Sequence, residues 1–495
     1  MPTQPTANDG LNVIIITTDQ QSAGSLPLYG NPLAKMPHLD AFADRGVVFD
    51  NAFTSCPLCV PARVSMFTGQ YPSTHGSLNN QIPMGSGKHH LLRLLKENGY
   101  RTAIAGKNHC FGPDDMEYFD SIAECGHYGP IHDNGNPVPG EYCRPREYLQ
   151  QCADLRSAWG STITPFAADT LGTAWTTTKA VDFLNTAGPA SEPFFLWYSI
   201  ADPHIPFQTC EPYASMYPLA SVPLPPLPDN EMDTKPRAQQ LDRAVMAGDA
   251  VDEQTIRRIR SIYYGMNTYI DDELGRFFRR MTDLDLWNRT LVIYMSDHGE
   301  YLGEHRMIRK SKAAYDCLVK IPFIVRAPDA FALNRGSRTR TFVSLEDVMP
   351  SVLHATGIET PPEVQGRSIF CDESGDSGRS PAERDHIVGE YGVHTRPWPA
   401  DKPYDVCAGP LARDFRPAMK VGGYGKMRFV RTEHWKLVVY VDDRNELYHL
   451  AEDPWELENL YGTPGTEPVV SELMDRLLQD VMVTTNSWVT TKEVS

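Results

Sequence analysis

A cysteine and an arginine stand four residues apart in the segment Cys59-Val60-Pro61-Ala62-Arg63. Proline suits the first position of a helix, where a missing N–H group costs nothing, so we expect a helix that starts at Pro61 and runs through residues 62–68 to Gly69. Cys59 would then lie at the helix N-terminus, where unpaired backbone donors and the helix dipole favour a negative group. Arg63, one turn further on, could clamp that group with its forked guanidinium. The segment therefore predicts a nucleophile beside an oxyanion pocket.

Four short apolar runs are each followed at once by polar side chains. The runs span residues 11–18, 102–105, 194–200 and 291–296, and their β-branched and aromatic content predicts buried strands of a mostly parallel sheet. In open α/β sheets, ligands bind beyond the carboxyl ends of the strands, so we expect the residues that follow to converge on one site. These residues are Asp19 and Gln20, Lys107 and His109, His204, and Asp297 and His298.

Two segments resemble the diagnostic motifs of the formylglycine-dependent (type I) sulfatases of the alkaline phosphatase superfamily. The Cys59 segment, continued by residues 68–72 and His75-Gly76, resembles the first sulfatase signature, and residues 99–109 resemble the second. The resemblance implies that a dedicated maturation enzyme oxidises Cys59 to formylglycine. It also implies that the hydrated aldehyde attacks the sulfur of a sulfate ester, with S–O cleavage.

The same resemblance implies one divalent cation, held by Asp19, Gln20, Asp297, His298 and the modified Cys59. Each strand-end pair alone could be an ordinary strand-to-loop exit, but the Cys59 segment makes the metal interpretation the stronger one. Many sulfatases carry two aspartates at the first pair, whereas this chain has Asp19-Gln20, a pairing also found in choline sulfatases and phosphonate monoester hydrolases. Calcium is our first expectation for an oxygen-rich shell, and the histidine ligand leaves manganese and magnesium open.

The resemblance also implies the roles of the remaining site residues. Lys107 and His109 would face the nucleophile and the sulfate, with His109 as the base that restores the aldehyde. His204 matches the family histidine near the leaving oxygen, and Lys310 matches the second active-site lysine, with a basic neighbour on either side of that position. The side chains expected to neutralise the sulfuryl oxygens, together with the cation, are Arg63, Lys107 and Lys310.

Three alternatives remain open. A phosphonate or phosphate mono- or diester hydrolase on the same scaffold would share both strand-end pairs, although Lys107 and His109 favour the sulfatase. Cys56 and Cys59 have the spacing of a redox dithiol at a helix N-terminus, but a thioredoxin-like protein has no use for the strand-end pairs. The third alternative is a binding protein without catalysis, against which the complete set of site residues argues.

The composition excludes several classes of partner. The chain has 495 residues and a net charge of −17, which disfavours a general affinity for nucleic acid or anionic membranes. Residues 1–10 lack the basic start and apolar core of a signal peptide, and no later run has the length of a membrane span, so we expect a soluble, cytoplasmic protein. The ten cysteines form no small-domain disulfide framework, and we expect free thiols.

The pattern along the chain predicts an α/β protein with a large mixed, mostly parallel sheet flanked by helices, and the resemblance implies an alkaline-phosphatase-like fold. We expect a catalytic domain of residues 1–375 and a smaller C-terminal α+β domain of residues 376–495 with a short antiparallel sheet. The expected strands are residues 321–325, 427–431, 435–441 and 446–450, and the expected helices are residues 91–98, 256–281, 347–356 and 469–481. The proline-rich residues 218–239 are expected to form a surface loop near the site.

The sequence does not identify the substrate beyond a small organosulfate or a sulfated sugar. Side chains that could contact an alcohol or sugar moiety are Trp398, Tyr404, Arg416, Lys426 and His434. The oligomeric state is equally open, a homo-oligomer included.

Overall fold

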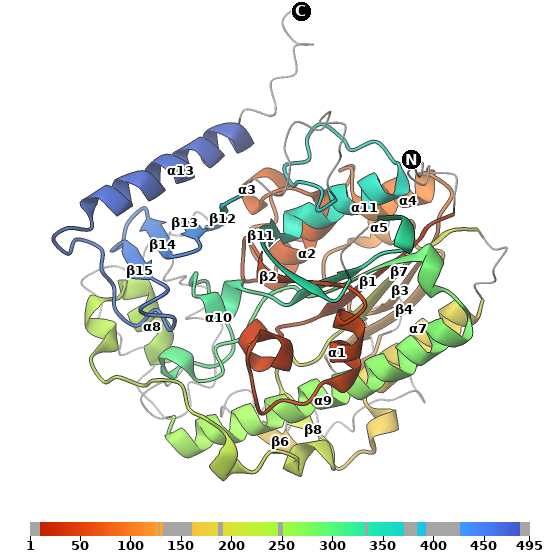
Figure 1. Ribbon diagram of the computed structural model, residues 1–495, viewed down its shortest axis with the longest axis horizontal. Helices are drawn as coiled ribbons and strands as arrows, with labels where there is room; N and C mark the ends of the chain where they lie inside the picture. The colour runs from red at the N-terminus through yellow and green to blue at the C-terminus, as the bar shows by residue number, and fades with distance from the viewer. Residues whose placement is uncertain are drawn as a thin grey trace, which may run out of the picture.

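The computed structural model describes residues 10–127, 129–131, 161–186, 192–245, 251–331, 335–370, 384–392 and 426–485. Within these residues, the main sheet has nine strands in the order β11-β2-β10-β9-β1-β7-β3-β4-β5 (Figure 1). In chain order the strands are β1 (Asn12–Thr18), β2 (Val47–Phe53), β3 (Arg101–Gly106), β4 (Ser121–Gly126), β5 (Gly129–Pro130), β7 (Phe194–Ile200), β9 (Thr290–Ser296), β10 (Phe323–Arg326) and β11 (Ser337–Ser344).

The centre of the sheet is built from the four apolar runs that the sequence singles out. Strands β9, β1, β7 and β3 are neighbours and run parallel, with Ile14 paired to Leu196 on one side and to Val292 on the other. Their carboxyl ends therefore meet at one edge. Strand β10 runs antiparallel between β9 and β2, so the sheet is mixed but mostly parallel, as predicted.

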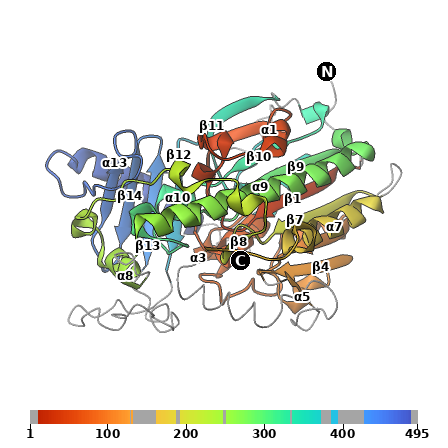
Figure 2. The same ribbon diagram turned by 90° about the horizontal axis from the view of Figure 1, so that it is seen from below.

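Helices cover both faces of this sheet because its central strands are apolar on both sides. Val13 and Ile15 face a core shared with α2 (Cys59–Thr68), α4 (Leu91–Glu97) and α11 (Val348–Thr356). Ile14 and Ile16 face the opposite core, which includes α1 (Pro37–Ala43), α7 (Gly172–Asn185) and the long α9 (Glu253–Asp283). Figure 2 shows α9 and α7 lying across one face of the sheet. Side chains alternate between the faces of a strand, so a continuous apolar run implies helices on both sides.

The helix that carries the cysteine differs from the prediction at its start. It begins at Cys59 and not at Pro61, with Leu58 as the N-cap residue. Pro61 is thus the third helical residue, and this position costs no hydrogen bond because the first four N–H groups of a helix have no intrahelical partner. The first helical bond is from the amide of Ala62 to the carbonyl of Leu58, at 3.0 Å. Gly69 ends the helix in the left-handed conformation, as expected.

Several elements were not predicted. Strand β2 is interrupted by Asp50 and Asn51, β11 is rich in arginine and threonine, and β4 contains few large apolar residues, so none of them shows a continuous apolar run. Helix α7 contains three consecutive threonines, which are weak helix formers. The expected loop of residues 218–239 contains short 3-10 turns at Leu219–Ser221 and Glu231–Thr234 and the first residues of α8 (Arg237–Val245).

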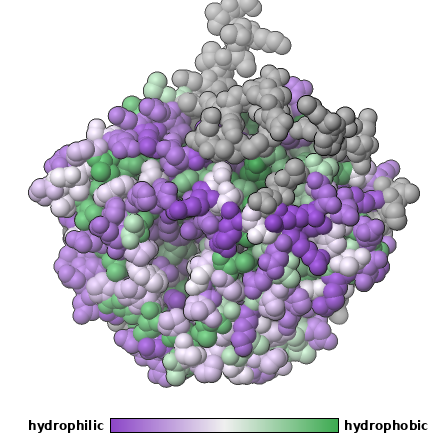
Figure 3. All heavy atoms as spheres, in the orientation of Figure 1, coloured by the Kyte–Doolittle hydropathy of each residue, from purple (hydrophilic) through white to green (hydrophobic). Residues whose placement is uncertain are grey.

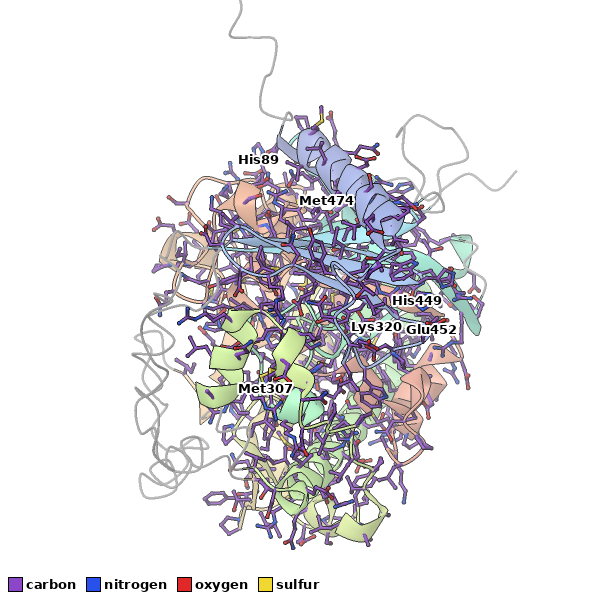
Figure 4. The ribbon with its side chains drawn as sticks, turned by 90° about the vertical axis from the view of Figure 1, so that its left-hand side faces the viewer. His89, Met307, Lys320, His449, Glu452 and Met474 are labelled. Carbon is purple, nitrogen blue, oxygen red and sulfur yellow. The ribbon has the colours of Figure 1, made fainter. Side chains whose placement is uncertain are left out.

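A second, antiparallel sheet has the order β12 (His386–Tyr391), β13 (Met427–Thr432), β14 (Trp435–Tyr440) and β15 (Glu446–His449). One face packs Val430 and Leu437 against Leu477 of α13 (Glu467–Thr485), and the other face places Phe429 in a core shared with Phe53 of the main sheet. Figure 4 views this side of the molecule. The predicted domain boundary, between residues 375 and 376, lies outside the described residues.

Polar and apolar residues are interspersed on the face shown in Figure 3. Among the described helices, none has the length and apolar content needed to cross a membrane. The described cysteines form no disulfide bond, in agreement with the prediction for that part of the chain.

Candidate active site

Cys59 lies at the carboxyl edge of the main sheet and is almost completely buried, with 1% of its surface exposed. Its Sγ atom is 2.9 Å from Nζ of Lys310, 3.2 Å from Nε2 of His298 and 3.7 Å from Oδ1 of Asp19. Asp19 follows β1, and His298 and Lys310 follow β9. The structure thus brings the helix N-terminus and two strand ends together at the thiol.

The expected metal ligands form one compact group. One ligand atom each from Asp19, Cys59, Asp297 and His298 lies within 4.8 Å of the others. Oδ1 of Asp19 and Oδ1 of Asp297 are 3.8 and 3.6 Å from Nε2 of His298. Donor atoms that bind one cation at metal–oxygen distances of about 2.0 to 2.6 Å lie at similar distances from one another. Nδ1 of His298 donates to the carbonyl of Gly299 at 2.9 Å, so the lone pair of Nε2 faces the group.

The fifth expected ligand, Gln20, joins this group through its amide oxygen. Lys310 Nζ lies 2.9 Å from Oε1 of Gln20 and also 2.9 Å from Nε2 of His298. The ammonium group of Lys310 also contacts Sγ of Cys59, so it contacts three of the expected ligand atoms. Two carboxylates, an amide oxygen and an imidazole nitrogen facing one point suit a divalent cation of the calcium, magnesium or manganese type.

Arg63 lies in the site, but its guanidinium is not an open clamp for an oxyanion. Nε donates to Oδ2 of Asp297 at 2.9 Å, and Nη2 donates to Oδ2 of Asp19 at 3.2 Å. Nη1 donates to the carbonyl of Lys107 at 3.0 Å and to Oγ of Ser199 at 2.9 Å. The arginine therefore holds the two carboxylates in place, which corrects the expectation drawn from its spacing to Cys59.

Two lysines lower the pKa of the Cys59 thiol. Burial by itself would raise the pKa of Cys59, but the ammonium groups of Lys107 and Lys310 hold this pKa well below its ordinary value of 9.0. Lys107 also forms an ion pair with Asp19. Burial would lower the pKa of Lys310, yet the neighbouring Cys59 and Asp19 raise it, so Lys310 stays charged. The site therefore favours an anion at position 59.

Three histidines besides His298 lie around the thiol. His109 is exposed, has a positive φ of 64°, and its hydrogen bond to Cys59 helps to lower the pKa of the thiol. Nδ1 of His204 donates to the carbonyl of Ile205 at 2.8 Å. Burial, then the charge of Lys310, lowers the pKa of His204 to about 4.

The third histidine, His127, was not predicted. Its ring stacks on His204 with 3.9 Å between centroids and 20° between planes. Its Nε2 atom accepts a hydrogen bond from Nζ of Lys107 at 3.0 Å. Burial, then the charges of His204 and Lys107, holds the pKa of His127 well below 6.5. His127 follows strand β4, which contains few large apolar residues, so no apolar run marks it in the sequence.

Two further residues of the site were also missed. Ser199 donates to the carbonyl of Lys107 at 2.6 Å and accepts from Arg63, and its place in the apolar run of β7 was a usable signal. Glu300 is completely buried behind Gln20, three residues after Asp297. Burial raises the pKa of Glu300 to about 7.

The residues expected to contact an alcohol or sugar are placed only in part. Trp398, Tyr404 and Arg416 lie outside the described residues. Lys426 precedes β13 and His434 lies between β13 and β14, and both are exposed.

Comparisons with known proteins agree with this geometry. Residues 11–358 match the family described as Sulfatase, and residues 422–482 match the family described as N-sulphoglucosamine sulphohydrolase, C-terminal. An arylsulfatase of Clostridium perfringens is 26% identical over 77% of this chain and 83% of its own length. An ulvan-active sulfatase of Formosa agariphila is 27% identical over 96% of this chain and 81% of its own length.

Solved structures show the same fold. The phosphonate monoester hydrolase of Silicibacter pomeroyi superposes with a TM-score of 0.75 at 22% identity, covering 96% of each chain. A protein solved in complex with its substrate D-glucosamine-2-N,6-O-disulfate superposes with a TM-score of 0.72 at 19% identity. That match covers 98% of this chain and all of the other.

Proposed function

This chain belongs to the sulfatase family, and from that premise we propose that it cleaves the S–O bond of sulfate esters with a formylglycine made from Cys59 and one divalent cation. Membership of the family makes it a sulfuric ester hydrolase. The observation that carries the mechanism is the position of the Cys59 thiol, 3.2 Å from Nε2 of His298 and 2.9 Å from Nζ of Lys310. A nucleophile at this position would have cation ligands on one side and a charged donor beside it.

The residues that would hold the cation are Asp19, Gln20, Asp297, His298 and residue 59. When bound, the cation polarises the nucleophilic oxygen of residue 59 together with a sulfate oxygen. Arg63 fixes both aspartates through Nε and Nη2, so these two carboxylates would be held in place for the cation. Calcium is the ion we propose first, because most of the donors are oxygens.

The other side chains act on the sulfate itself. Lys107 and Lys310 would donate hydrogen bonds to the sulfuryl oxygens, where negative charge spreads in the transition state. Lys310 would also stabilise the leaving oxygen, since a neutral His204 uses its single N–H group at the carbonyl of Ile205. His109 would take a proton from the hydroxyl of residue 59 that did not attack, so that sulfate leaves and the aldehyde returns.

A sulfated sugar or a small organosulfate is the substrate class we propose. Support comes from similar proteins, one named as ulvan-active and one solved with a disulfated glucosamine. A set of sulfated monosaccharides and choline sulfate, assayed for sulfate release, would identify the preferred member. Equal and very slow release from every compound would contradict a small sulfated substrate.

Phosphonate ester hydrolysis is the second candidate function. The fold superposes on a phosphonate monoester hydrolase, and the Asp19-Gln20 and Asp297-His298 pairs are compatible with both reactions. Lys107 and His109 favour the sulfate ester. The ratio of kcat/KM for an aryl sulfate and an aryl phosphonate with the same leaving group decides between the two.

The modification is tested by mass spectrometry of the tryptic peptide that ends at Arg63, from protein produced together with a maturation enzyme. We expect an aldehyde at position 59 and an unchanged thiol at Cys56 in the same peptide. A fully active protein that carries only a thiol at position 59 would contradict the proposal.

A further inference from the structure

Glu300 is a buried carboxylate whose hydrogen bonds join two parts of the active site. Its Oε2 atom accepts from the side-chain amide nitrogen of Gln20. Its Oε1 atom accepts from the backbone amides of Leu302, at 3.2 Å, and Arg309. The proposed mechanism gives this residue no part, although none of its surface is exposed.

The contact with Glu300 decides which end of the Gln20 amide faces the cation ligands. The two ends of a glutamine amide have nearly the same shape, so only the chemistry of their partners distinguishes oxygen from nitrogen. A carboxylate accepts hydrogen bonds, and it therefore draws the NH2 group of Gln20 to its own side. The oxygen is left facing the site, where it accepts from Lys310 at 2.9 Å. The backbone amide of Gln20 is fixed as well, by a 3.0 Å bond to Asp297.

The contact with Glu300 also explains why position 20 carries an amide. A second carboxylate at position 20 would lie directly against Glu300, and two buried like charges in contact cannot both be ionised without a large penalty. An amide removes the repulsion and supplies the donor that Glu300 needs. Gln20 and Glu300 are therefore a matched pair, with the amide toward the cation ligands and the carboxyl group behind it.

The same carboxylate holds the loop that ends at Lys310. Leu302, His305, Arg306 and Arg309 all have positive φ values, between 50° and 72°. Side-chain-bearing residues avoid this region, so a loop with four of them needs hydrogen bonds from outside to keep its shape. Glu300 binds the backbone at both ends of this stretch, at Leu302 and at Arg309.

We propose that Glu300 is a positioning residue that turns the oxygen of Gln20 toward the cation and holds the loop that carries Lys310. This inference rests on the proposed function, because it presumes a cation among Asp19, Gln20, Asp297 and His298. It adds a partner outside the ligand set and assigns a physical reason to the glutamine.

Exchange of the two side chains tests the pair. In Glu300→Gln, the new amide oxygen must accept from Leu302 and Arg309, so its NH2 group faces Gln20, which turns its own NH2 group toward the cation. We expect this variant to bind Ca²⁺ about 10 to 100 times more weakly. In the double variant Q20E/E300Q, donor and acceptor change places and every hydrogen bond is restored. We expect its Ca²⁺ affinity to return to within a few-fold of the unsubstituted protein, or to exceed it.

The measurement is calorimetric titration of the full-length, metal-free protein with Ca²⁺, with the thermal midpoint of each metal-free variant as the check on folding. Glu304→Gln is the matched control, since Glu304 lies on the same loop but has no place in the pair, and its affinity should not change. An affinity of E300Q equal to that of the unsubstituted protein overturns the inference, as does a double variant no better than E300Q. If the unsubstituted protein binds no divalent cation, the proposed function fails first.

Discussion

Two of the groups of charged residues in the described part of the chain differ in how their charges are arranged. In the group between the main and small sheets, Lys436 contacts Glu456 at 2.6 Å and Asp316 at 2.5 Å, and Arg431 contacts Asp316 at 3.0 Å. Each charge there has an opposite charge beside it. In the group around Cys59, Arg63 and Lys107 pair with the two aspartates, and Lys310 lies 2.9 Å from the thiol. The first group neutralises itself, whereas the second is organised to receive an anion.

The pair of nearby cysteines shows that burial alone does not explain the difference. Cys56 and Cys59 are both buried, three positions apart. Burial raises the pKa of Cys56, and the carboxylates of Glu390 and Glu346 raise it further. For Cys59, Lys107 and Lys310 outweigh the effect of burial and lower the pKa. The ionisation of a buried group therefore depends on which charges the fold places next to it.

The largest expected effect separates these two cysteines. Cys59→Ala removes the nucleophile, and we expect kcat for an aryl sulfate to fall by at least about 10⁴-fold, as for other nucleophile deletions. Cys56→Ser is the matched control and should keep kcat within a few-fold, because no active-site group contacts it among the described interactions. Comparable losses in both variants would revive the dithiol interpretation of this segment.

The paired group is tested by Lys436→Met. This change leaves Asp316 and Glu456 buried without their shared cation, and we expect the free energy of unfolding to fall by about 3 to 5 kcal/mol. Urea denaturation measures it. The kcat of the folded fraction should change little, since Lys436 lies between the sheets and not at Cys59. A loss of kcat without a loss of stability would mean that the two groups are coupled.

Removal of a cationic side chain from the active site should act mainly on catalysis. We expect Lys310→Met to lower kcat by about 10² to 10³-fold, because a donor to developing charge is lost. The free energy of unfolding should fall as well, because Cys59 and Asp19 stabilise the charged form of Lys310 and raise its pKa in the folded protein. Lys312→Met is the control, because the Lys312 ammonium lies over the ring of Tyr391 at 4.9 Å. Equal effects of the two changes would show that the loop, and not the charge, is what matters.

The smallest expected effect concerns the docking of α13. His386 on β12 contacts Asp480 of α13 and Asp385, each at 2.7 Å. Burial would lower the pKa of His386, but these two carboxylates raise it above 6.5. The stabilisation is thus complete below about pH 6.5 and is lost as the pH rises through the raised pKa, with an amplitude of at most about 1 kcal/mol. Urea denaturation of His386→Asn should lack this pH dependence, and an unchanged profile would contradict the assignment.

Much of the central sheet, and the long helix that covers it, could be predicted from the sequence. The four apolar runs became adjacent parallel strands, and the predicted helix of residues 256–281 lies within α9. These elements were predictable because hydrophobic periodicity is a local property. Strand β2 was not predictable, because Asp50 interrupts its apolar run. The charge of Asp50 is paired by Arg338 of β11, almost three hundred positions away.

The sequence alone was enough to identify Cys59 at a helix start and the expected ligands at the ends of strands, but not His127, Ser199 or Glu300. Only the tertiary structure decided what several of them do there. Arg63 binds carboxylates 44 and 234 positions away, and Gln20 is oriented by Glu300, 280 positions away. Hydrogen bonding and ionisation depend on which groups packing brings within a few ångströms, and local sequence does not contain that information.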